Sequence, residues 1–277
     1  MNNKFLITGA TGFVGRQVLS KLLEKKKDVR IIVRKDKENF LGDINSRAEI
    51  VTTDDLFEES VDWWNEQCKD IDTIIHLAWY SEPGKYLLSS KNIECLNGSL
   101  NLAKGAINSG VRRFVGIGTC FEYDLNAGRL SIDTQLKPSS PYAAAKAGLY
   151  TFLSQLLTTK SIEFTWCRLF YIYGEGEDDR RLVPYIRKQL SKGLVAELSS
   201  GKQVRDFLNV SVVGKMITDV ALSQKQGPIN ICSGTPITVR QLAEQIADEY
   251  GQRDLLRFGA RPENLTDPIV VLGVPNL

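Results

Sequence analysis

The residues with the clearest chemical potential in this sequence are a tyrosine and a lysine four positions apart, Tyr142 and Lys146. A helix that begins near Pro141 would place both side chains on one face, about one turn apart. A lysine ammonium favours the phenolate form of a nearby tyrosine, whose reference pKa is about 10. The pair could therefore move a proton to or from a carbonyl or alcohol oxygen. The same pattern also occurs by chance on solvated helix faces, so its meaning depends on the elements around it.

The first supporting element is a glycine-rich turn near the N-terminus. Lys4–Thr8 predicts a short strand, and apolar residues at helical spacing follow from Val14 to Leu23. Between them lies Gly9-Ala10-Thr11-Gly12-Phe13-Val14-Gly15, with the spacing G-x-x-G-x-x-G. A strand, such a turn and a helix form a dinucleotide-binding unit, in which the helix N-terminus faces the pyrophosphate. The alternative is a glycine-rich turn without a ligand.

The end of the second predicted strand, Val29–Val33, bears on the choice of cofactor. Arg34 and Lys35 follow it, where sites that bind NAD usually place an acid for the ribose 2′-hydroxyl. Basic residues at this point suit a 2′-phosphate, so the sequence predicts NADP(H) in preference to NAD. The alternative is that both are surface charges, because Asp36 follows directly.

Composition limits the remaining function classes. A net charge of +2 over 277 residues predicts no strong electrostatic attraction to nucleic acid or membrane surfaces. The sequence contains no apolar run of about eighteen residues and does not begin like a signal peptide, so we expect a cytoplasmic protein. Five cysteines without pairing or metal-ligand spacing indicate reduced, buried thiols and no metal site.

His76 is the only histidine of the chain. A single histidine argues against a Ser-His-Asp hydrolase and against most zinc sites. We expect it to be a residue late in a strand and near the cofactor, rather than a base.

Strands and helices alternate through the first two thirds of the chain, which predicts a parallel sheet covered on both faces, a doubly wound Rossmann α/β fold. We place the dinucleotide-binding domain at 1–172 plus about 207–230, and a smaller substrate-binding lobe at 173–206 and 231–277. The predicted strands are Glu49–Thr52, Thr73–Leu77, Phe114–Ile117, Phe164–Leu169, Gln203–Val210 and Pro228–Ile231, and the predicted helices Tyr86–Ser109, Pro141–Thr159, Leu182–Leu190 and Val239–Tyr250.

These motifs resemble the extended short-chain dehydrogenases/reductases, in the branch of NAD(P)-dependent nucleotide-sugar epimerases and dehydratases, over nearly the whole chain. Asp55-Leu56 resembles the pair that contacts adenine, and His76-Leu77-Ala78 the end of the fourth strand. Together with the charge argument, the resemblance implies a cofactor site made of Gly9, Thr11, Gly12, Phe13, Val14, Gly15, Arg34, Lys35, Asp55, Leu56, Leu77, Ala78, Tyr142 and Lys146.

The resemblance also implies a third catalytic residue, a Ser or Thr at the end of the fifth strand, which here is Thr119. Its hydroxyl would donate to the substrate oxygen while Tyr142 passes the proton. Lys146 would hold the nicotinamide ribose and lower the pKa of the tyrosine. The alternative for Thr119 is an ordinary strand-end hydroxyl bonded to nearby backbone.

Departures from the family pattern narrow the reaction. Sugar 4,6-dehydratases of the family carry Asp-Glu directly after the Thr, whereas this chain has Cys120 and Phe121, so we do not expect a dehydratase. Glu122 is close, but we expect it to point elsewhere. Tyr171 stands where many members have an asparagine that contacts the sugar nucleotide, and Arg205 lies in a segment similar to R-D-F, whose Arg commonly contacts the substrate's phosphates. The predicted substrate contacts are Cys120, Phe121, Tyr171 and Arg205.

The stretch 113–124 looks most like reductases of 4-keto-6-deoxy nucleotide sugars. The resemblance therefore implies NADP(H)-dependent reduction of the 4-keto group of a dTDP-, CDP- or similarly linked 4-keto-6-deoxyhexose, with Tyr142 as general acid. One alternative is a 4-epimerase with tightly bound NAD, and another is a non-enzymatic NADP(H)-sensing protein, because a fold does not fix a function. Relatives often dimerise through the helices near 86–109 and 141–159, so we expect a homodimer.

Overall fold

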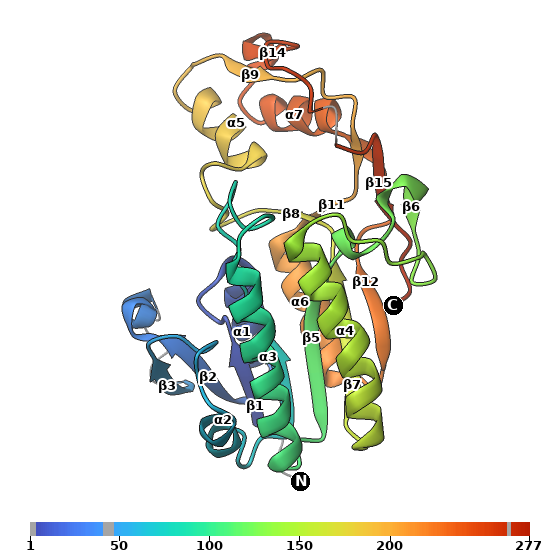
Figure 1. Ribbon diagram of the computed structural model, residues 1–277. Helices are drawn as coiled ribbons and strands as arrows, with labels where there is room; N and C mark the ends of the chain where they lie inside the picture. The colour runs from blue at the N-terminus through green and yellow to red at the C-terminus, as the bar shows by residue number, and fades with distance from the viewer. Residues whose placement is uncertain (1–3, 41–46, 265–266) are drawn as a thin grey trace.

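The computed structural model describes residues 4–40, 47–264 and 267–277, and its main feature there is a seven-stranded parallel sheet (Figure 1). The strand order is β3-β2-β1-β4-β5-β7-β12, and every neighbouring pair is parallel. The strands are β1 (Lys4–Thr8), β2 (Asp28–Arg34), β3 (Glu49–Thr53), β4 (Thr73–His76), β5 (Arg113–Thr119), β7 (Glu163–Leu169) and β12 (Gly227–Ile231).

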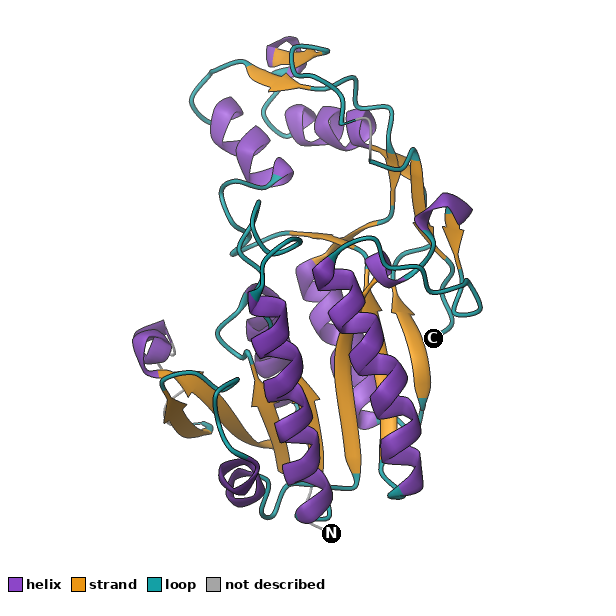
Figure 2. Ribbon diagram, viewed as in Figure 1, coloured by secondary structure: helices purple, strands orange, loops and turns teal. Residues whose placement is uncertain are grey.

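Helices cover both faces of this sheet (Figure 2). On one face, α1 (Phe13–Glu24) packs against α6 (Val210–Leu222). On the other face, α3 (Lys91–Asn108) lies between α2 (Val61–Gln67) and α4 (Pro141–Thr159). The arrangement confirms the predicted doubly wound α/β fold.

The remaining elements form a layer above the carboxyl ends of the strands (Figure 1). Two helices and a two-stranded pair share a separate apolar core, and two small sheets connect this layer to the main sheet. The elements are β6 (Arg129–Leu130), β8 (Tyr171–Tyr173), α5 (Leu182–Leu190), β9 (Ala196–Leu198), β10 (Val204–Arg205), β11 (Phe207–Asn209), β13 (Ile237–Thr238), α7 (Val239–Asp248), β14 (Leu256–Phe258) and β15 (Val270–Gly273). Because β6 pairs with β15, part of the range 1–172 belongs structurally with the C-terminal segments. The division into two domains at the expected boundaries stays a prediction.

Two predicted elements differ from the structure. The helix expected from Tyr86 begins only at Lys91, because the Asn92 amide donates to the carbonyl oxygens of Tyr86 and Ser89 and holds the preceding residues in turns. The strand expected at 203–210 is interrupted at Asp206, which separates β10 from β11. The buried Asp206 carboxylate accepts hydrogen bonds from the backbone N–H groups of 233, 234 and 273, and this residue belongs to neither strand.

The strand order reverses between β1 and β4, and this reversal determines where a ligand can bind. In open parallel sheets, the loops that leave two such strands diverge and leave a crevice at their carboxyl ends. Here the loop after β1 is the glycine-rich turn, and the loop after β4 begins with Leu77 and Ala78. The fold therefore places both predicted cofactor-binding segments at one crevice.

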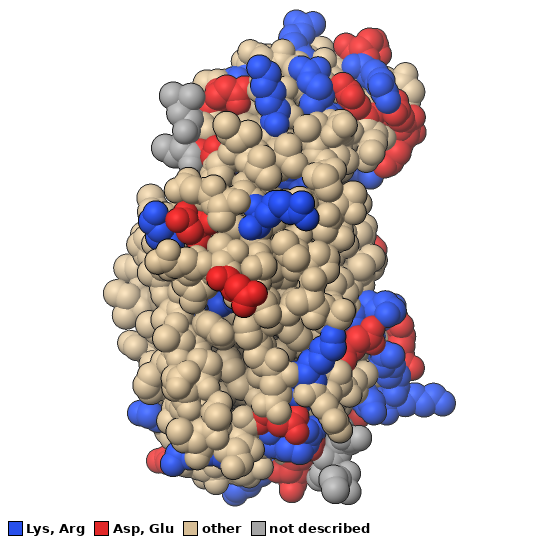
Figure 3. Space-filling view, turned by 90° about the vertical axis from the view of Figure 1, so that its right-hand side faces the viewer, with Lys and Arg blue, Asp and Glu red and all other residues tan. Residues whose placement is uncertain are grey.

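On the face seen in Figure 3, basic and acidic side chains lie interspersed, and they gather mostly towards the two ends of the molecule. No helix among the described residues is both long enough and apolar enough to cross a membrane. All five cysteines lie in the described part of the chain, where they are buried and unpaired.

Candidate active site

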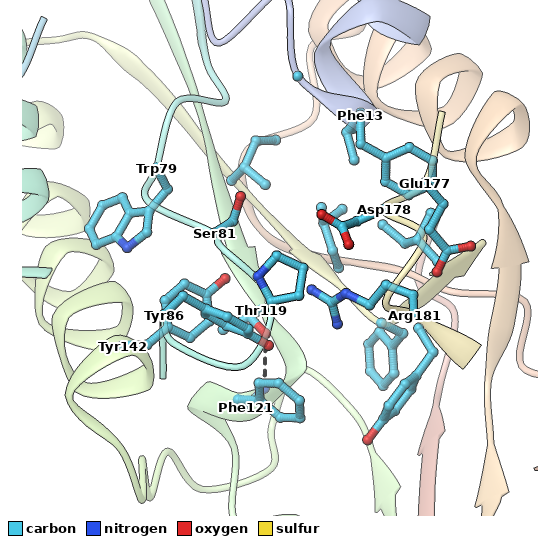
Figure 4. A pocket seen from close by; sticks show the side chains of 18 of the residues that line it. Phe13, Trp79, Ser81, Tyr86, Thr119, Phe121, Tyr142, Glu177, Asp178 and Arg181 are labelled. Atoms are coloured by element: carbon cyan, nitrogen blue, oxygen red, sulfur yellow. Dashed lines mark hydrogen bonds between the residues drawn. The ribbon is translucent and has the colours of Figure 1, made fainter. Parts of the chain in front are cut away.

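A cleft of about 850 Å³ opens at the carboxyl ends of the strands, between the main sheet and the C-terminal layer (Figure 4). Residues from both predicted binding segments and from all three predicted catalytic positions line it. The predicted residues that the structure brings together there are Gly9, Gly12, Phe13, Val14, Gly15, Leu77, Ala78, Thr119, Phe121, Tyr142, Lys146, Tyr171 and Arg205.

The glycine-rich turn has no room for side chains at two positions. Gly9 has φ +74°, and a Cβ there would lie 2.7 Å from the backbone nitrogen of Ala78. A Cβ on Gly15 would lie 2.0 Å from the carbonyl oxygen of Gly9. The turn therefore packs directly against the loop after β4 and against the start of α1, and it leaves a bare backbone surface at a helix N-terminus. Such a surface fits the pyrophosphate of a dinucleotide.

Lys146 is buried, with 3% of its surface exposed. Its ammonium donates to the Ile117 carbonyl oxygen at 2.7 Å and lies 3.8 Å from the centre of the Trp79 ring. Burial lowers the pKa of Lys146 to about 7 because an ammonium loses hydration in this environment. The carbonyl and the indole ring partly replace that hydration.

Tyr142 lies one helical turn before Lys146 in α4, as the spacing predicts. Its ring contacts Tyr86 edge-on at a centroid distance of 4.8 Å and Trp79 at 6.4 Å. Burial raises the pKa of Tyr142, and contact with the Thr119 hydroxyl lowers it in part. That Lys146 lowers the pKa of the tyrosine stays a prediction. With its pKa raised above the ordinary value, the phenol carries its proton at neutral pH.

Thr119 ends β5, where its side chain caps the short 3₁₀ helix Cys120–Glu122. Its hydroxyl oxygen accepts a hydrogen bond from the Phe121 N–H at 3.3 Å. Its own N–H donates to the Glu122 carboxylate at 2.8 Å. The hydroxyl still reaches Tyr142, so the local bond expected of a strand-end threonine and the contact with the tyrosine coexist.

Glu122 points away from the cleft, as expected, although it belongs to the 3₁₀ helix rather than to a strand. The carboxylate is fully buried and accepts from Arg168 Nε at 2.7 Å and from Trp166 Nε1 at 3.0 Å. These bonds, together with the one from the Thr119 N–H, connect the end of β5 to β7. Glu122 is a structural support of the site and does not face a substrate.

His76 lies at the end of β4, as its position in the sequence predicts. Its Nδ1 lies 2.7 Å from the Thr8 hydroxyl and its Nε2 lies 2.8 Å from the Ser99 hydroxyl. Because Ser99 donates to a backbone carbonyl, Nε2 carries the proton and Nδ1 accepts from Thr8. Burial lowers the pKa of His76 to about 3, so the ring stays neutral and ties β4 to β1 and α3.

Arg34 and Lys35, expected at a 2′-phosphate, lie outside the cleft lining. Both side chains are exposed, and each has an acidic partner: Arg34 pairs with Asp36 at 3.3 Å and Lys35 with Asp54 at 2.9 Å. They do lie together at the carboxyl end of β2, where a ribose would be expected. Their role in choosing the cofactor stays a prediction.

Four other predicted residues lie outside the lining of the cleft. Thr11 belongs to the glycine-rich turn, and its carbonyl oxygen accepts from Arg16. Asp55 follows β3 and caps the Phe57 N–H, while Leu56 is packed in the core. The adenine contact of Asp55 and Leu56, and the place of Thr11 in the cofactor loop, stay predictions. Cys120 is 2% exposed and packs into an apolar cluster at the 3₁₀ turn after β5, so its contact with a substrate stays a prediction.

The remaining predicted substrate contacts form one group at the C-terminal side of the cleft. Tyr171 packs edge-on against Phe121 at 6.3 Å and lies under the Arg205 guanidinium at 5.2 Å. Arg205 is nearly buried and pairs with Asp267 at 2.6 Å. Its charge is therefore partly satisfied within the chain, and a contact with a substrate phosphate stays a prediction.

Two segments that border the cleft were not predicted as parts of the site: residues 79–86, in the loop after β4, and residues 176–181, before α5. Glu82 of the first segment pairs with Arg180 of the second at 3.6 Å, so this ion pair joins the two segments. Arg181 lies 5.7 Å from the centre of the Tyr86 ring. Burial raises the pKa of the Glu177 carboxyl to about 7. The position of Trp79 directly after His76-Leu77-Ala78 and the acidic glycine-rich segment 174–179 were the available signals.

The model of the NAD dependent epimerase/dehydratase family matches residues 5–232, most of the chain. The chain belongs to this family. The matched span includes the glycine-rich turn, the loop after β4 and the three residues Thr119, Tyr142 and Lys146.

A similar curated relative is the dTDP-6-deoxy-L-talose 4-dehydrogenase (NAD(+)) of Aggregatibacter actinomycetemcomitans, which is 26% identical over 97% of this chain and 98% of its own. Among solved structures, the fold is similar to a UDP-N-acetylglucosamine 4-epimerase from Methanobrevibacter ruminantium M1, with a TM-score of 0.86, 24% identity and coverage of 99% and 90%. It is also similar to the UDP-glucose 4-epimerase of Thermus thermophilus in complex with NAD, with a TM-score of 0.82, 20% identity and coverage of 98% and 90%.

Proposed function

We propose that this protein reduces the 4-keto group of a nucleotide-linked 4-keto-6-deoxyhexose, using NADP(H). The observation that carries the proposal is a half-buried phenol beside the Thr119 hydroxyl and one turn from a buried lysine, at the carboxyl end of a parallel sheet. A reductase needs an acid at this position, whereas a dehydratase needs further acid–base groups where Cys120 and Phe121 stand. The full-length similarity to a dTDP-6-deoxy-L-talose 4-dehydrogenase supports this choice.

The cofactor, when bound along the glycine-rich turn, would supply the hydride. Thr119 would donate a hydrogen bond to the carbonyl oxygen, so that negative charge developing there is stabilised. Tyr142 would give its proton to that oxygen. The Lys146 ammonium would bind the nicotinamide ribose, and its position is fixed by the Ile117 carbonyl. On the substrate side, Phe121 and Tyr171 would contact the sugar and Arg205 the pyrophosphate, as arginine does in bidentate contacts.

The assay for this function follows the loss of NADPH absorbance when the purified protein is mixed with dTDP- or CDP-4-keto-6-deoxyglucose. We expect oxidation of one NADPH for each keto sugar reduced. No oxidation with either nucleotide would contradict the proposal.

Cofactor choice is tested at Arg34. We expect Arg34→Gln to raise KM for NADPH by about tenfold and to leave KM for NADH nearly unchanged, because a lost charged hydrogen bond to phosphate is worth roughly 1.5–3 kcal/mol. The matched control is Arg47→Gln, a charge change away from the end of β2. Equal effects of Arg34→Gln on both cofactors would indicate that Arg34 is only a surface charge paired with Asp36.

A nucleotide-sugar 4-epimerase is the second candidate, because the fold is also similar to two 4-epimerases. Such an enzyme would use the same three residues but would show no net redox change. Release of stoichiometric NAD on denaturing the purified protein would favour it.

We also propose that the protein is a homodimer of the cytoplasm, where buried unpaired cysteines remain reduced. The outer faces of α3 and α4 carry the exposed apolar side chains Ile93 and Phe152, and α3 packs beside α4. Two copies that pair these helices would cover both side chains. Light scattering should then give twice the chain mass of 31.0 kDa.

A further inference from the structure

The loop between β4 and α3 carries two aromatic rings that contact Tyr142 or Lys146 (Figure 4). Trp79 contacts the Tyr142 ring edge-on at 6.4 Å and lies 3.8 Å from the Lys146 ammonium. Tyr86 contacts the Tyr142 ring edge-on at 4.8 Å. Edge-to-face contacts at these distances define the orientation of a ring as well as its position.

A single buried amide holds the Trp79 ring and the backbone of Tyr86. Asn92, in the first turn of α3, is 3% exposed. Its Oδ1 accepts from Trp79 Nε1 at 2.8 Å, and its Nδ2 donates to the carbonyl oxygens of Tyr86 and Ser89, each at 2.8 Å. The indole nitrogen can only donate, so it fixes which end of the amide is oxygen. Both ends of the Asn92 amide are therefore used to fix the loop.

The placement of Lys146 depends on the same contacts. Among the described residues, its ammonium has one hydrogen-bond acceptor, the Ile117 carbonyl oxygen, and the Trp79 ring is the aromatic group nearest to it. A buried cation over the face of an indole is attracted electrostatically by the ring. If the Trp79 ring turned, Lys146 would lose this contact and Tyr142 would lose one of its two aromatic neighbours.

We propose that Asn92, acting through Trp79 and Tyr86, is a positioning residue for the Tyr142–Lys146 pair. This inference rests on the proposed function, because it assigns the positioning to proton transfer by Tyr142. Asn92 touches neither of the two side chains in a hydrogen bond. It acts by fixing the Trp79 ring and the backbone that carries the Tyr86 ring.

A double-mutant cycle tests the proposal with Asn92→Ala, Trp79→Phe and the double variant. The phenylalanine keeps an aromatic ring but cannot donate to Asn92. We expect Asn92→Ala to lower kcat by about ten- to a hundredfold, since small displacements of reacting groups have effects of this size. KM for NADPH should change by less than about threefold on the same argument. The double variant should be no worse than Asn92→Ala alone, because both changes break the same connection.

The matched control is Asn101→Ala, which removes an amide–carbonyl bond from the same helix, to Glu59 at 3.1 Å, outside the cleft. We expect its kcat to equal that of the unchanged protein. A melting temperature lowered equally in Asn92→Ala and Asn101→Ala, with kcat unchanged in both, would overturn the proposal. Effects of Asn92→Ala and Trp79→Phe that multiply in the double variant would also overturn it.

A second readout does not depend on turnover. Of the four tryptophans, all in the described residues, only Trp79 lines the cleft, and the emission difference between the unchanged protein and Trp79→Phe isolates it. We expect Asn92→Ala to shift this emission. If the emission shifts but the protein reduces no 4-keto sugar, the proposed function is wrong and the positioning role of Asn92 still stands. If the enzyme is active and Asn92→Ala changes neither the emission nor kcat, the positioning role is wrong and the proposed function still stands.

Discussion

Replacing Tyr142 with phenylalanine is expected to lower kcat for keto-sugar reduction by about a thousandfold, because proton transfer by a positioned acid contributes roughly 10²–10⁴. The change removes one oxygen atom and keeps the ring that packs against Tyr86 and Trp79. The Kd for NADPH should therefore change little, since the glycine-rich turn and Lys146 are left in place.

The matched control is Tyr150→Phe, two turns further along α4, where the ring packs against Phe164 and Trp166 and does not line the described cleft. Steady-state kinetics and NADPH titration of both variants provide the measurement. Equal kcat values for Tyr142→Phe and the unchanged protein would show that the proton comes from another group, and a non-enzymatic sensor would likewise lose no function on this change.

Replacing Glu122 with glutamine should have the largest effect on stability. Glu122 and Arg168 form a fully buried ion pair at 2.7 Å, with the guanidinium stacked between the Tyr123 and Tyr150 rings at 4.6 and 4.5 Å. Removing one charge of a buried pair costs about 3–5 kcal/mol, because the other charge remains buried without compensation. A glutamine amide would also direct an N–H group at donors of Trp166 or Arg168.

Denaturant unfolding measures the lost free energy of unfolding. Because the Glu122 carboxylate accepts a hydrogen bond from the N–H of Thr119, kcat of the folded variant should also fall, and steady-state kinetics measure that fall. Glu66→Gln is the control, since it breaks an exposed pair with Lys69 and such pairs contribute little. An unchanged free energy of unfolding for Glu122→Gln would mean that the buried pair does not support the end of β5.

Two helices and the glycine-rich turn could be predicted because residues within each segment determine its structure. The boundaries of α4 and α5 agree with the predicted Pro141–Thr159 and Leu182–Leu190, because Ser140 caps α4, Pro141 begins it, and apolar residues repeat at helical spacing through both. The glycine-rich turn was predictable because its spacing reflects close backbone contacts that no other residue allows. The fold and the family followed from these segments, and the family match confirms them.

The parts that differ from the prediction depend on side-chain contacts that hydrophobic spacing does not encode. The Asn92 amide sets the start of α3 through bonds to Tyr86 and Ser89, and the Asp206 carboxylate interrupts the expected strand by binding backbone groups near 233 and 273. The surroundings of Tyr142 cannot be derived from a spacing of four residues either, because Trp79 and Tyr86 come from another segment. The inward position of Cys120 was not predicted, because a 3₁₀ turn at the end of β5 breaks the alternation of a strand.

The central claim is net hydride transfer to a sugar carbonyl with Tyr142 as the acid. It is tested most directly with NADPH carrying deuterium at C4 of the nicotinamide and with dTDP-4-keto-6-deoxyglucose as substrate. The account predicts one deuterium at C4 of the product hexose for each cofactor oxidised, and none with Tyr142→Phe on the same timescale. Recovery of the unreduced keto sugar, without deuterium and without loss of NADPH, would contradict it.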